Sequence, residues 1–220
     1  MKKTKRILAT VLALTLAFAL FGCGGASGGG DYGGEETETE ANIPEDPGVG
    51  DRFTFGMFDG NPIEWRVLDV ADGKVLVISE EILTQQMYYK NLLSVTWETS
   101  DIRSWLNGEF YTAAFGSGDR DKIAETEVGN PDSEDYGTPG GNDTADKIFL
   151  LSLDEVNRYF ADYADRAATY EQQITWWWLR SPGSLDYFAS RIGGVGDVFT
   201  GGAVVNAPDG GVRPAMWINL

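Results

Sequence analysis

The stretch RFTFGMFDGNPIEWRVLDVADGKVLVIS, residues 52–79, decides the fold class because two turns divide it into three strand-like runs. The first turn is Asp59-Gly60-Asn61-Pro62 and the second is Asp72-Gly73, and residues of these types favour tight connections. The runs beside them alternate or are continuously apolar, as half-buried and buried strands do. The sequence therefore predicts an antiparallel opening of three strands, at residues 52–58, 63–70 and 74–79.

Helices are predicted after this opening. Ser100 can accept hydrogen bonds from the free amides of a helix that starts at residue 101, and apolar residues share one face of that helix. Residues 109–115 are predicted to add another helical turn or two. A further helix starts at the capping box Ser152-Leu153-Asp154-Glu155 and is expected to reach about Tyr163.

The rest of the chain is predicted to form loops and short strands. Residues 130–146 are polar and rich in Gly and Asp, which is typical of a long loop, and residues 148–151 (IFLL) are predicted as a short buried strand. From Trp176 onward, glycines and aromatic residues alternate with short apolar runs. The predicted class is α+β: a single compact domain of antiparallel strands, a few helices and long loops.

Two segments near the C-terminus have unusual compositions. They are WWWLRSPG at residues 176–183 and GVRPAMWI at residues 211–218. Each places an arginine, Arg180 or Arg213, directly after or inside an apolar run. A guanidinium in such a place suits carboxylates and backbone carbonyls. Both arginines are therefore predicted to tie loops to the core, and ligand contact is the alternative.

The N-terminus has the layout of an export signal. Four basic residues within the first six precede an uncharged apolar run at residues 7–21, which is shorter than the roughly 20 residues that a membrane-spanning helix needs. The sequence Leu20-Phe21-Gly22-Cys23 resembles a bacterial lipobox, in which the cysteine is acylated and becomes the first mature residue. The resemblance implies a lipid on Cys23 and anchoring to the cell membrane on its extracytoplasmic side. An uncleaved membrane anchor is the alternative.

Composition divides the chain into three parts. Residues 1–22 are the predicted lipoprotein signal peptide, and residues 23–50 are the predicted lipidated cysteine with a disordered linker rich in Gly and Glu. The linker contains GGASGGG and EETETE, and neither run can bury apolar surface. Residues 51–220 are the predicted globular domain, which is long enough to fold around its own core.

The composition also excludes several classes of function. The formal net charge is −17, and residues 51–220 hold 27 acidic against 13 basic residues. This balance argues against a nucleic-acid partner, because contacts with phosphates supply most non-specific affinity. The chain has no histidine, and Cys23 is its only cysteine. Nucleophiles activated by histidine, zinc sites built on His or Cys, and disulfides are therefore excluded.

The order of the motifs resembles a known domain. The segments IEWRVL (63–68), SWLN (104–107) and GNDTADKIFLLS (141–152), followed by the two C-terminal segments, are similar to an uncharacterised domain of exported proteins common in gut bacteria. The closing segments also resemble the C-type-lectin-like fold of relatives of formylglycine-generating enzymes. That resemblance implies a C-type-lectin-like domain at residues 51–220. It implies no catalysis, because the catalytic cysteines of the enzyme branch have no counterpart here.

Ligand contacts are expected on the loops between Trp178 and Val212, where glycines permit tight loops and aromatic residues supply contact surface. Aromatic clusters more commonly serve as core packing, and this alternative applies above all to the tryptophans. The candidate ligand-binding residues are Trp176, Trp178, Tyr187, Arg191 and Phe199.

The polar loop carries a weak signal for calcium. Carboxylate oxygens are ligands that Ca²⁺ prefers, but the spacing of the acids is not that of an EF-hand, and a solvated acidic loop is the alternative. The candidate ligands are Asp132, Asp135, Asp143 and Asp146. No other cofactor is expected.

Three functions remain open on the sequence. The first is a non-catalytic module, tethered to the surface, that binds a glycan or a surface protein. The second is a glycan hydrolase that uses an Asp/Glu pair, and the third is a structural or accessory envelope lipoprotein without a small ligand. A concave site with two carboxylates favours the hydrolase, whereas an exposed aromatic platform without such a pair favours binding.

Overall fold

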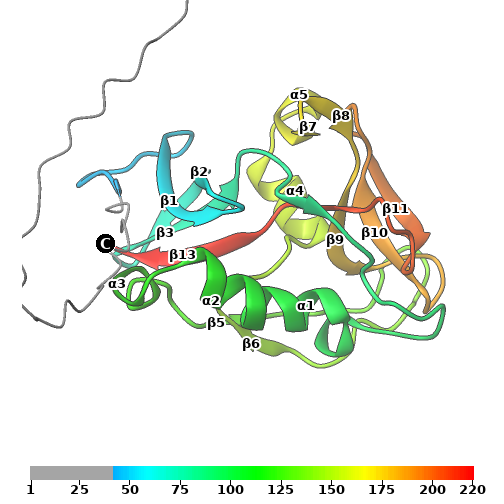
Figure 1. Cartoon of the computed structure of the whole chain (residues 1–220). Coiled ribbons are helices and arrows are strands. Elements are labelled where there is room, and N and C mark those ends of the chain that lie inside the picture. The colour runs from blue at the N-terminus through cyan, green and yellow to red at the C-terminus, as the bar shows by residue number, and fades with distance from the viewer. Residues whose placement is uncertain (1–41) are drawn as a thin grey trace, which may run out of the picture. The chain divides into compact units, whose positions relative to one another are not determined.

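The computed structural model of the protein describes residues 42–220 (Figure 1). The predicted signal peptide, Cys23 and most of the predicted linker lie outside the described residues. The strands are β1 (Arg52–Phe58), β2 (Asn61–Ala71), β3 (Lys74–Ser79), β4 (Thr84–Gln85), β5 (Thr126–Val128), β6 (Thr144–Asp146), β7 (Ala168–Tyr170), β8 (Gln173–Thr175), β9 (Trp177–Pro182), β10 (Phe188–Ile192), β11 (Val198–Val204), β12 (Gly211–Val212) and β13 (Ala215–Asn219). The helical segments are η1 (Trp97–Thr99), α1 (Asp101–Trp105), η2 (Leu106–Phe110), α2 (Tyr111–Ala114), α3 (Ser117–Arg120), α4 (Leu153–Tyr159) and α5 (Tyr163–Arg166).

The three predicted N-terminal strands are confirmed as β1, β2 and β3, which pair antiparallel in chain order. Both connections have two central residues with positive φ: Asp59 (48°) with Gly60 (76°), and Asp72 (52°) with Gly73 (71°). Asp-Gly favours such two-residue hairpins because their twist matches that of the strands. The first turn is tighter than predicted, because Asn61 and Pro62 already belong to β2.

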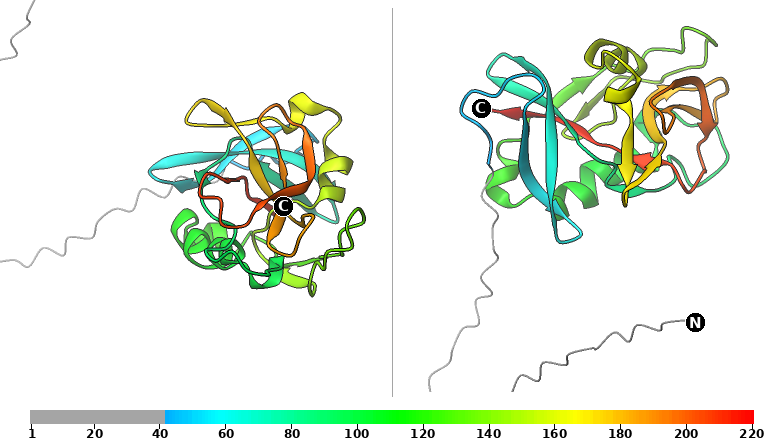
Figure 2. Two further views of the ribbon diagram at one scale, coloured as in Figure 1. Left: turned by 90° about the vertical axis from the view of Figure 1, so that its right-hand side faces the viewer. Right: turned by 90° about the horizontal axis from the view of Figure 1, so that it is seen from above.

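The last strand of the chain completes this first sheet. β13 pairs antiparallel with β3, so the sheet order is β1-β2-β3-β13. A second sheet has the order β11-β10-β9-β12-β4, in which the β12–β9 pair is parallel. Figure 1 and the right-hand view of Figure 2 both show the C-terminal segment crossing from the second sheet to the first. Arg213 and Pro214, between β12 and β13, form this crossing.

The helical run α1–η2–α2 covers the first sheet with aromatic side chains. Phe115, just after α2, lies with its ring centroid 5.2 Å from that of Phe55 in β1 and 6.0 Å from that of Phe110. Gly56 makes room for it, because a Cβ at this position, where φ is 70°, would lie 2.5 Å from the Phe115 ring. The predicted cap is confirmed: the Ser100 hydroxyl accepts a hydrogen bond from the amide of Arg103.

Two predicted elements differ from the structure. Residues 148–151 are buried as predicted but form no strand. Phe149 makes an isolated bridge with Ala215, and the carbonyl of Leu151 accepts from the amide of Arg180 in β9 (3.0 Å). The capping box at Ser152 is confirmed, yet α4 ends at Tyr159 and the chain starts a separate helix, α5, at Tyr163. Asp162 caps that second helix by accepting from the amide of Asp165, which explains the break.

Residues 42–50, which the sequence assigns to the linker, lie on the domain. The amide of Gly50 donates to the carbonyl of Val67 (2.9 Å), the amide of Asn42 donates to the carbonyl of Thr54 (3.2 Å), and Ile43 packs against the core. Among the helices within residues 42–220, none has the length and apolar character that crossing a bilayer requires. The described part is thus a mixed fold of mostly antiparallel sheets with few helices.

Candidate functional site

The three consecutive tryptophans have different environments. Trp177 and Trp178 are completely buried, because β9 lies inside the second sheet and is covered on both faces. The Trp178 indole donates to the carbonyl of Gln86 (2.9 Å), so it has no exposed face on which a ligand could stack. Trp176 is only partly buried, and its ring meets that of Trp178 edge-on at 4.6 Å. Of the predicted tryptophan pair, only Trp176 reaches the surface.

Arg191 in β10 is held by two aromatic rings. Its guanidinium carbon lies 4.1 Å from the centre of the Phe199 ring and 5.2 Å from that of Trp176. Phe199 stands on β11 at the position paired with Arg191. Within residues 42–220 the structure shows neither an ion pair nor a hydrogen bond for the Arg191 guanidinium. Three of the predicted ligand-binding residues therefore come together, and one of them is a cation with unused donors.

Exposed apolar side chains lie at and beside the turn that follows β10, the strand of this arginine. Gly194 lies against Ile174, since a Cβ at the glycine would be 3.0 Å from Ile174 Cγ2, and Val195 follows directly. The exposed fractions are 61% for Tyr163, 68% for Ile174, 69% for Val195 and 40% for Phe199. Exposed apolar groups gathered at one place mark interaction sites. We call this surface the aromatic–arginine patch and define it as Ile174, Trp176, Arg191, Val195 and Phe199.

The patch stands on a rigid base. The turn between β10 and β11 is fixed at Gly196, where φ is 88° and a Cβ would lie 1.8 Å from the carbonyl oxygen of Tyr163. Arg166 Nε donates to the carbonyl of Gly196 (2.8 Å), and its guanidinium stacks 5.0 Å from the Tyr163 ring. The indole of Trp176 donates to Asp209 (3.2 Å). Ligand contacts on such a base need little ordering on binding.

Tyr187 does not belong to the patch. It precedes β10, whereas Arg191 lies near the other end of that strand. Its ring packs against Phe188 at 5.2 Å and against the core. Tyr187 is therefore a candidate for a separate surface only.

The two predicted structural arginines are both buried. Arg180 forms a forked ion pair with Glu155, at 2.5 Å and 3.0 Å, and also donates to the carbonyl of Leu150 (2.8 Å). Glu155 at the same time accepts from the amide of Ser152 in the capping box, so the pair ties β9 to the start of α4. Arg213 instead donates to the backbone carbonyls of Ser79 and Glu80.

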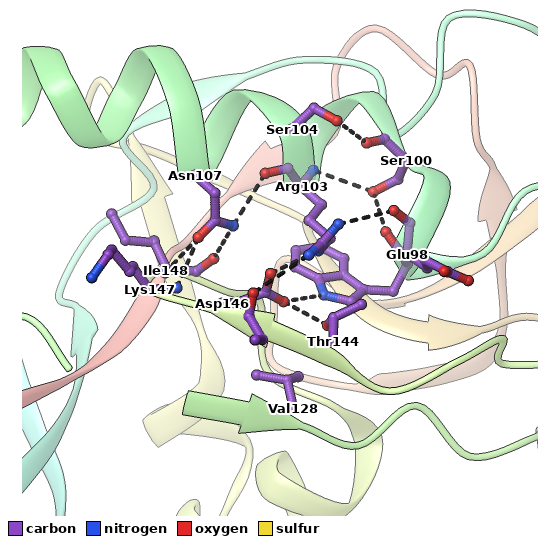
Figure 3. A network of polar contacts seen from close by, with 12 residues as sticks. Glu98, Ser100, Arg103, Ser104, Asn107, Val128, Thr144, Asp146, Lys147 and Ile148 are labelled. Atoms are coloured by element: carbon purple, nitrogen blue, oxygen red, sulfur yellow. Dashed lines mark hydrogen bonds and ion pairs between the residues drawn. The ribbon is translucent and has the colours of Figure 1, made fainter. Parts of the chain in front are cut away.

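The acidic residues proposed for calcium are dispersed. Asp132 and Asp143 each accept a backbone amide within their own loop, from Gly140 and Asn130, and Asp135 is exposed. Asp146 is buried in a different network (Figure 3). No group of three or more acidic, His or Cys side chains suited to a metal occurs within residues 42–220.

Asp146 connects its own strand, β6, with η1 and α1 through its two oxygens. Oδ1 accepts from Arg103 Nε (2.7 Å), and Oδ2 accepts from Trp97 Nε1 (2.8 Å) and from the Thr144 hydroxyl (2.7 Å). Figure 3 shows Asn107, on the same helix as Arg103, reaching the next backbone groups: its Oδ1 accepts from the amides of Lys147 and Ile148. These contacts fasten the α1–η2 helix to the 144–148 segment.

A groove that sequence reasoning missed lies between the β1–β2 turn, residues 80–83 and the β7–β8 turn. Its volume is about 400 Å³. Among its lining side chains are Asp59, Glu64, Glu80, Glu81 and Glu171, together with apolar residues such as Phe58 and Tyr170. Burial acts to raise the pKa of Glu80, but the hydrogen bond and charge of Arg66, helped by Arg213 and Arg52, bring that pKa below its ordinary value. Glu80 is therefore ionised at neutral pH.

Comparison with known families agrees with the motifs. Residues 72–220 match the model of a family described as Domain of unknown function (DUF6273). The chain belongs to the DUF6273 family. No curated protein and no solved structure matches the chain. The predicted resemblance to an uncharacterised domain is thus confirmed over this range, and the C-type-lectin-like relation stays a prediction.

The DUF6273 match contains the whole aromatic–arginine patch, Arg180, Arg213 and the Asp146 network. It starts at the β2–β3 turn, so β1 and β2 lie outside it, and with them Asp59 and Glu64 of the groove. The patch and the structural arginines therefore lie in the DUF6273 domain, whereas the groove is shared between that domain and the preceding hairpin.

Proposed function

We propose that the protein is a non-catalytic binding module of the cell surface, held to the membrane by a lipid on Cys23 and using the aromatic–arginine patch to bind a glycan. The observation that carries this proposal is Arg191, held between Trp176 and Phe199 beside exposed apolar side chains. Exposed aromatic rings offer stacking surfaces, and an unpaired guanidinium offers directed donors. The predicted C-type-lectin-like relation supports the same proposal.

The first prediction tests the patch. Phe199→Ala is expected to weaken binding of the full-length chain to an array of bacterial and host glycans by about tenfold, since stacking on an aromatic ring contributes roughly 1–2 kcal/mol. Stability should change by less than about 0.5 kcal/mol, because Phe199 is exposed. The matched control is Leu185→Ala, a residue of similar exposure (46%) in the β9–β10 loop, and it should bind like the wild type. Loss of binding in the control alone would move the site to the Tyr187 surface.

The second prediction tests the anchor. Cys23→Ser is expected to release the protein from the membrane or to leave an unprocessed precursor, because serine offers no thiol for acylation. Metabolic labelling with a clickable fatty acid, followed by membrane fractionation, measures this directly. Equal labelling of the variant and the wild type would contradict the proposal. Stable anchoring requires more than one acyl chain, since a single chain binds only marginally.

One observation favours a hydrolase as the second candidate, namely the groove with several carboxylates. Glycosidases place an acid and a base or nucleophile about 5–10 Å apart on such a surface. Glu80 is a poor general acid because it is ionised and paired with Arg66 and Arg52. Release of new reducing ends from the bound glycans, abolished by Glu64→Gln or Glu171→Gln but not by Phe199→Ala, would establish this function instead.

A further inference from the structure

We propose that the ligand of the aromatic–arginine patch is an acidic sugar and that Arg191 binds its carboxylate. This inference rests on the proposed binding function and adds the chemical class of the ligand.

Within residues 42–220, the Arg191 guanidinium has ring contacts but no ion pair or hydrogen bond. Most other guanidiniums of the described part have partners: Arg52 and Arg66 pair with Glu80, Arg103 with Asp146, Arg158 with Asp69 and Arg180 with Glu155, while Arg166 and Arg213 donate to carbonyls. Arg120 stacks on a single ring, that of Tyr111. Arg191 alone stacks on two rings without any such bond in residues 42–220. A partly exposed guanidinium in this setting has its full set of N–H donors available.

The two rings leave the N–H edges of the Arg191 guanidinium open. Stacking on Phe199 and Trp176 engages the faces of the guanidinium and leaves its edges, where the N–H groups point, for a ligand. The planar fork of donors matches the two oxygens of a carboxylate. Because the two rings hold the plane in place, less side-chain entropy is lost when the fork closes on a ligand.

Acidic residues lie close to the patch and limit how much negative charge a ligand can carry. Asp197 and Asp209 lie near the patch: a Cβ on Gly193 would be 2.5 Å from Asp197, and Asp209 accepts from Trp176. The domain as a whole is strongly acidic. Such a field repels dense polyanions, whereas a single carboxylate next to Arg191 gains local attraction at short range. The site therefore favours a sparsely charged ligand over a nucleic acid or a polyphosphate.

The rest of the patch is apolar and suits one face of a sugar ring. Phe199 exposes ring surface against Arg191, and Ile174 and Val195 expose apolar surface at the adjoining β10–β11 turn. A pyranose presents an apolar C–H face to such a surface while its carboxylate reaches the arginine. A hexuronic acid unit combines both features in one ring, which is why we assign this class.

The experiment compares a ligand whose carboxyl groups are ionised with the same ligand after methyl esterification. Short oligogalacturonates and their fully methyl-esterified forms are titrated against the full-length chain in detergent, by calorimetry or tryptophan fluorescence. The acid is expected to bind about tenfold or more tightly than the ester, since a hydrogen-bonded charge contributes roughly 1.5–3 kcal/mol. Arg191→Gln should bring the acid down to the level of the ester, with an unchanged melting temperature. The matched control is Arg158→Gln, an arginine with a 70% exposed side chain paired with Asp69, and it should leave the preference intact.

The outcomes separate the two proposals. Equal binding of acid and ester, or binding only of neutral glycans in a Phe199-dependent way, overturns the carboxylate inference and leaves the binding function standing. An Arg191-dependent preference for acidic peptides over acidic sugars overturns the sugar assignment. If no glycan binds and Phe199→Ala changes nothing, both proposals fail.

Discussion

Replacing Arg213 with alanine is expected to lower the free energy of unfolding by about 3 kcal/mol, one of the two largest effects predicted for this chain. Arg213 is completely buried at the crossing between the two sheets. Its Nε donates to the carbonyl of Ser79 (2.8 Å) and one terminal nitrogen donates to the carbonyl of Glu80 (3.1 Å). Alanine leaves these acceptors without their donors and opens a cavity beside Trp177 and Phe160.

The burial of the Arg213 charge limits how much stability the alanine variant loses. Burial lowers the pKa of Arg213 to about 9, and the nearby charge of Arg66 adds to the shift while that of Glu80 opposes it. The group stays protonated at neutral pH, so the folded state carries an unfavourable desolvation that the carbonyl bonds and ring contacts must offset. Alanine relieves that desolvation, which is why we expect about 3 kcal/mol and not the sum of the lost contacts.

Two companion variants separate these contributions. Arg213→Met fills the space without charge or donors, so it should destabilise by less than alanine. Arg191→Ala removes an arginine from the surface patch and should stay within about 0.5 kcal/mol of the wild type. Thermal unfolding measures all three, and 3 kcal/mol corresponds to roughly 6–12 °C in a chain of this size. A methionine variant more stable than the wild type would show that desolvation, not hydrogen bonding, dominates at this position.

Local signals accounted for the first half of the fold. The Asp-Gly turns set the β1–β2 and β2–β3 hairpins, and the side chains of Ser100 and Ser152 marked where helices begin. These features depend on neighbours in the sequence, so they can be read from a single chain.

Long-range pairing could not be read in the same way. No local pattern places β13 beside β3, and the apolar run 148–151 looks like a strand although its backbone meets the sheets through a bridge at Phe149 and a hydrogen bond at Leu151. Trp178 was a candidate ligand contact with core packing as the alternative, and the structure buries it, with its ring 5.7 Å from that of Tyr88.

The sequence predicted those members of the candidate site that lie close together in the chain. Trp176, Arg191 and Phe199 stand within one stretch of sequence that is rich in loops, and they do meet. Ile174 comes from β8, a segment too short to show a period, and only the tertiary fold brings it to the patch. The groove unites three distant segments and gave no local signal.

Asp146→Ala is expected to destabilise the protein by about 3–4 kcal/mol, the other large effect. Its carboxylate is completely buried and accepts from Arg103, Trp97 and Thr144. Alanine leaves the partly buried Arg103 guanidinium without its ion-pair partner, and the buried indole of Trp97 and hydroxyl of Thr144 lose their acceptor. The matched control is Asp143→Ala in the same segment, an exposed residue whose one oxygen accepts the amide of Asn130, and it should cost about 1 kcal/mol or less.

Asp146→Asn and a chelator distinguish this network from a calcium site. Asparagine has a similar shape to aspartate and keeps one acceptor oxygen. The free energy of unfolding of Asp146→Asn, measured in urea, should therefore lie between those of the alanine variant and the wild type. Calcium binding through Asp132, Asp143 and Asp146 would instead make the melting temperature of the wild type fall in the presence of a chelator, and it would make Asp143→Ala as damaging as Asp146→Ala. The structure favours the first outcome, because both oxygens of Asp146 already accept from protein donors at 2.7–2.8 Å.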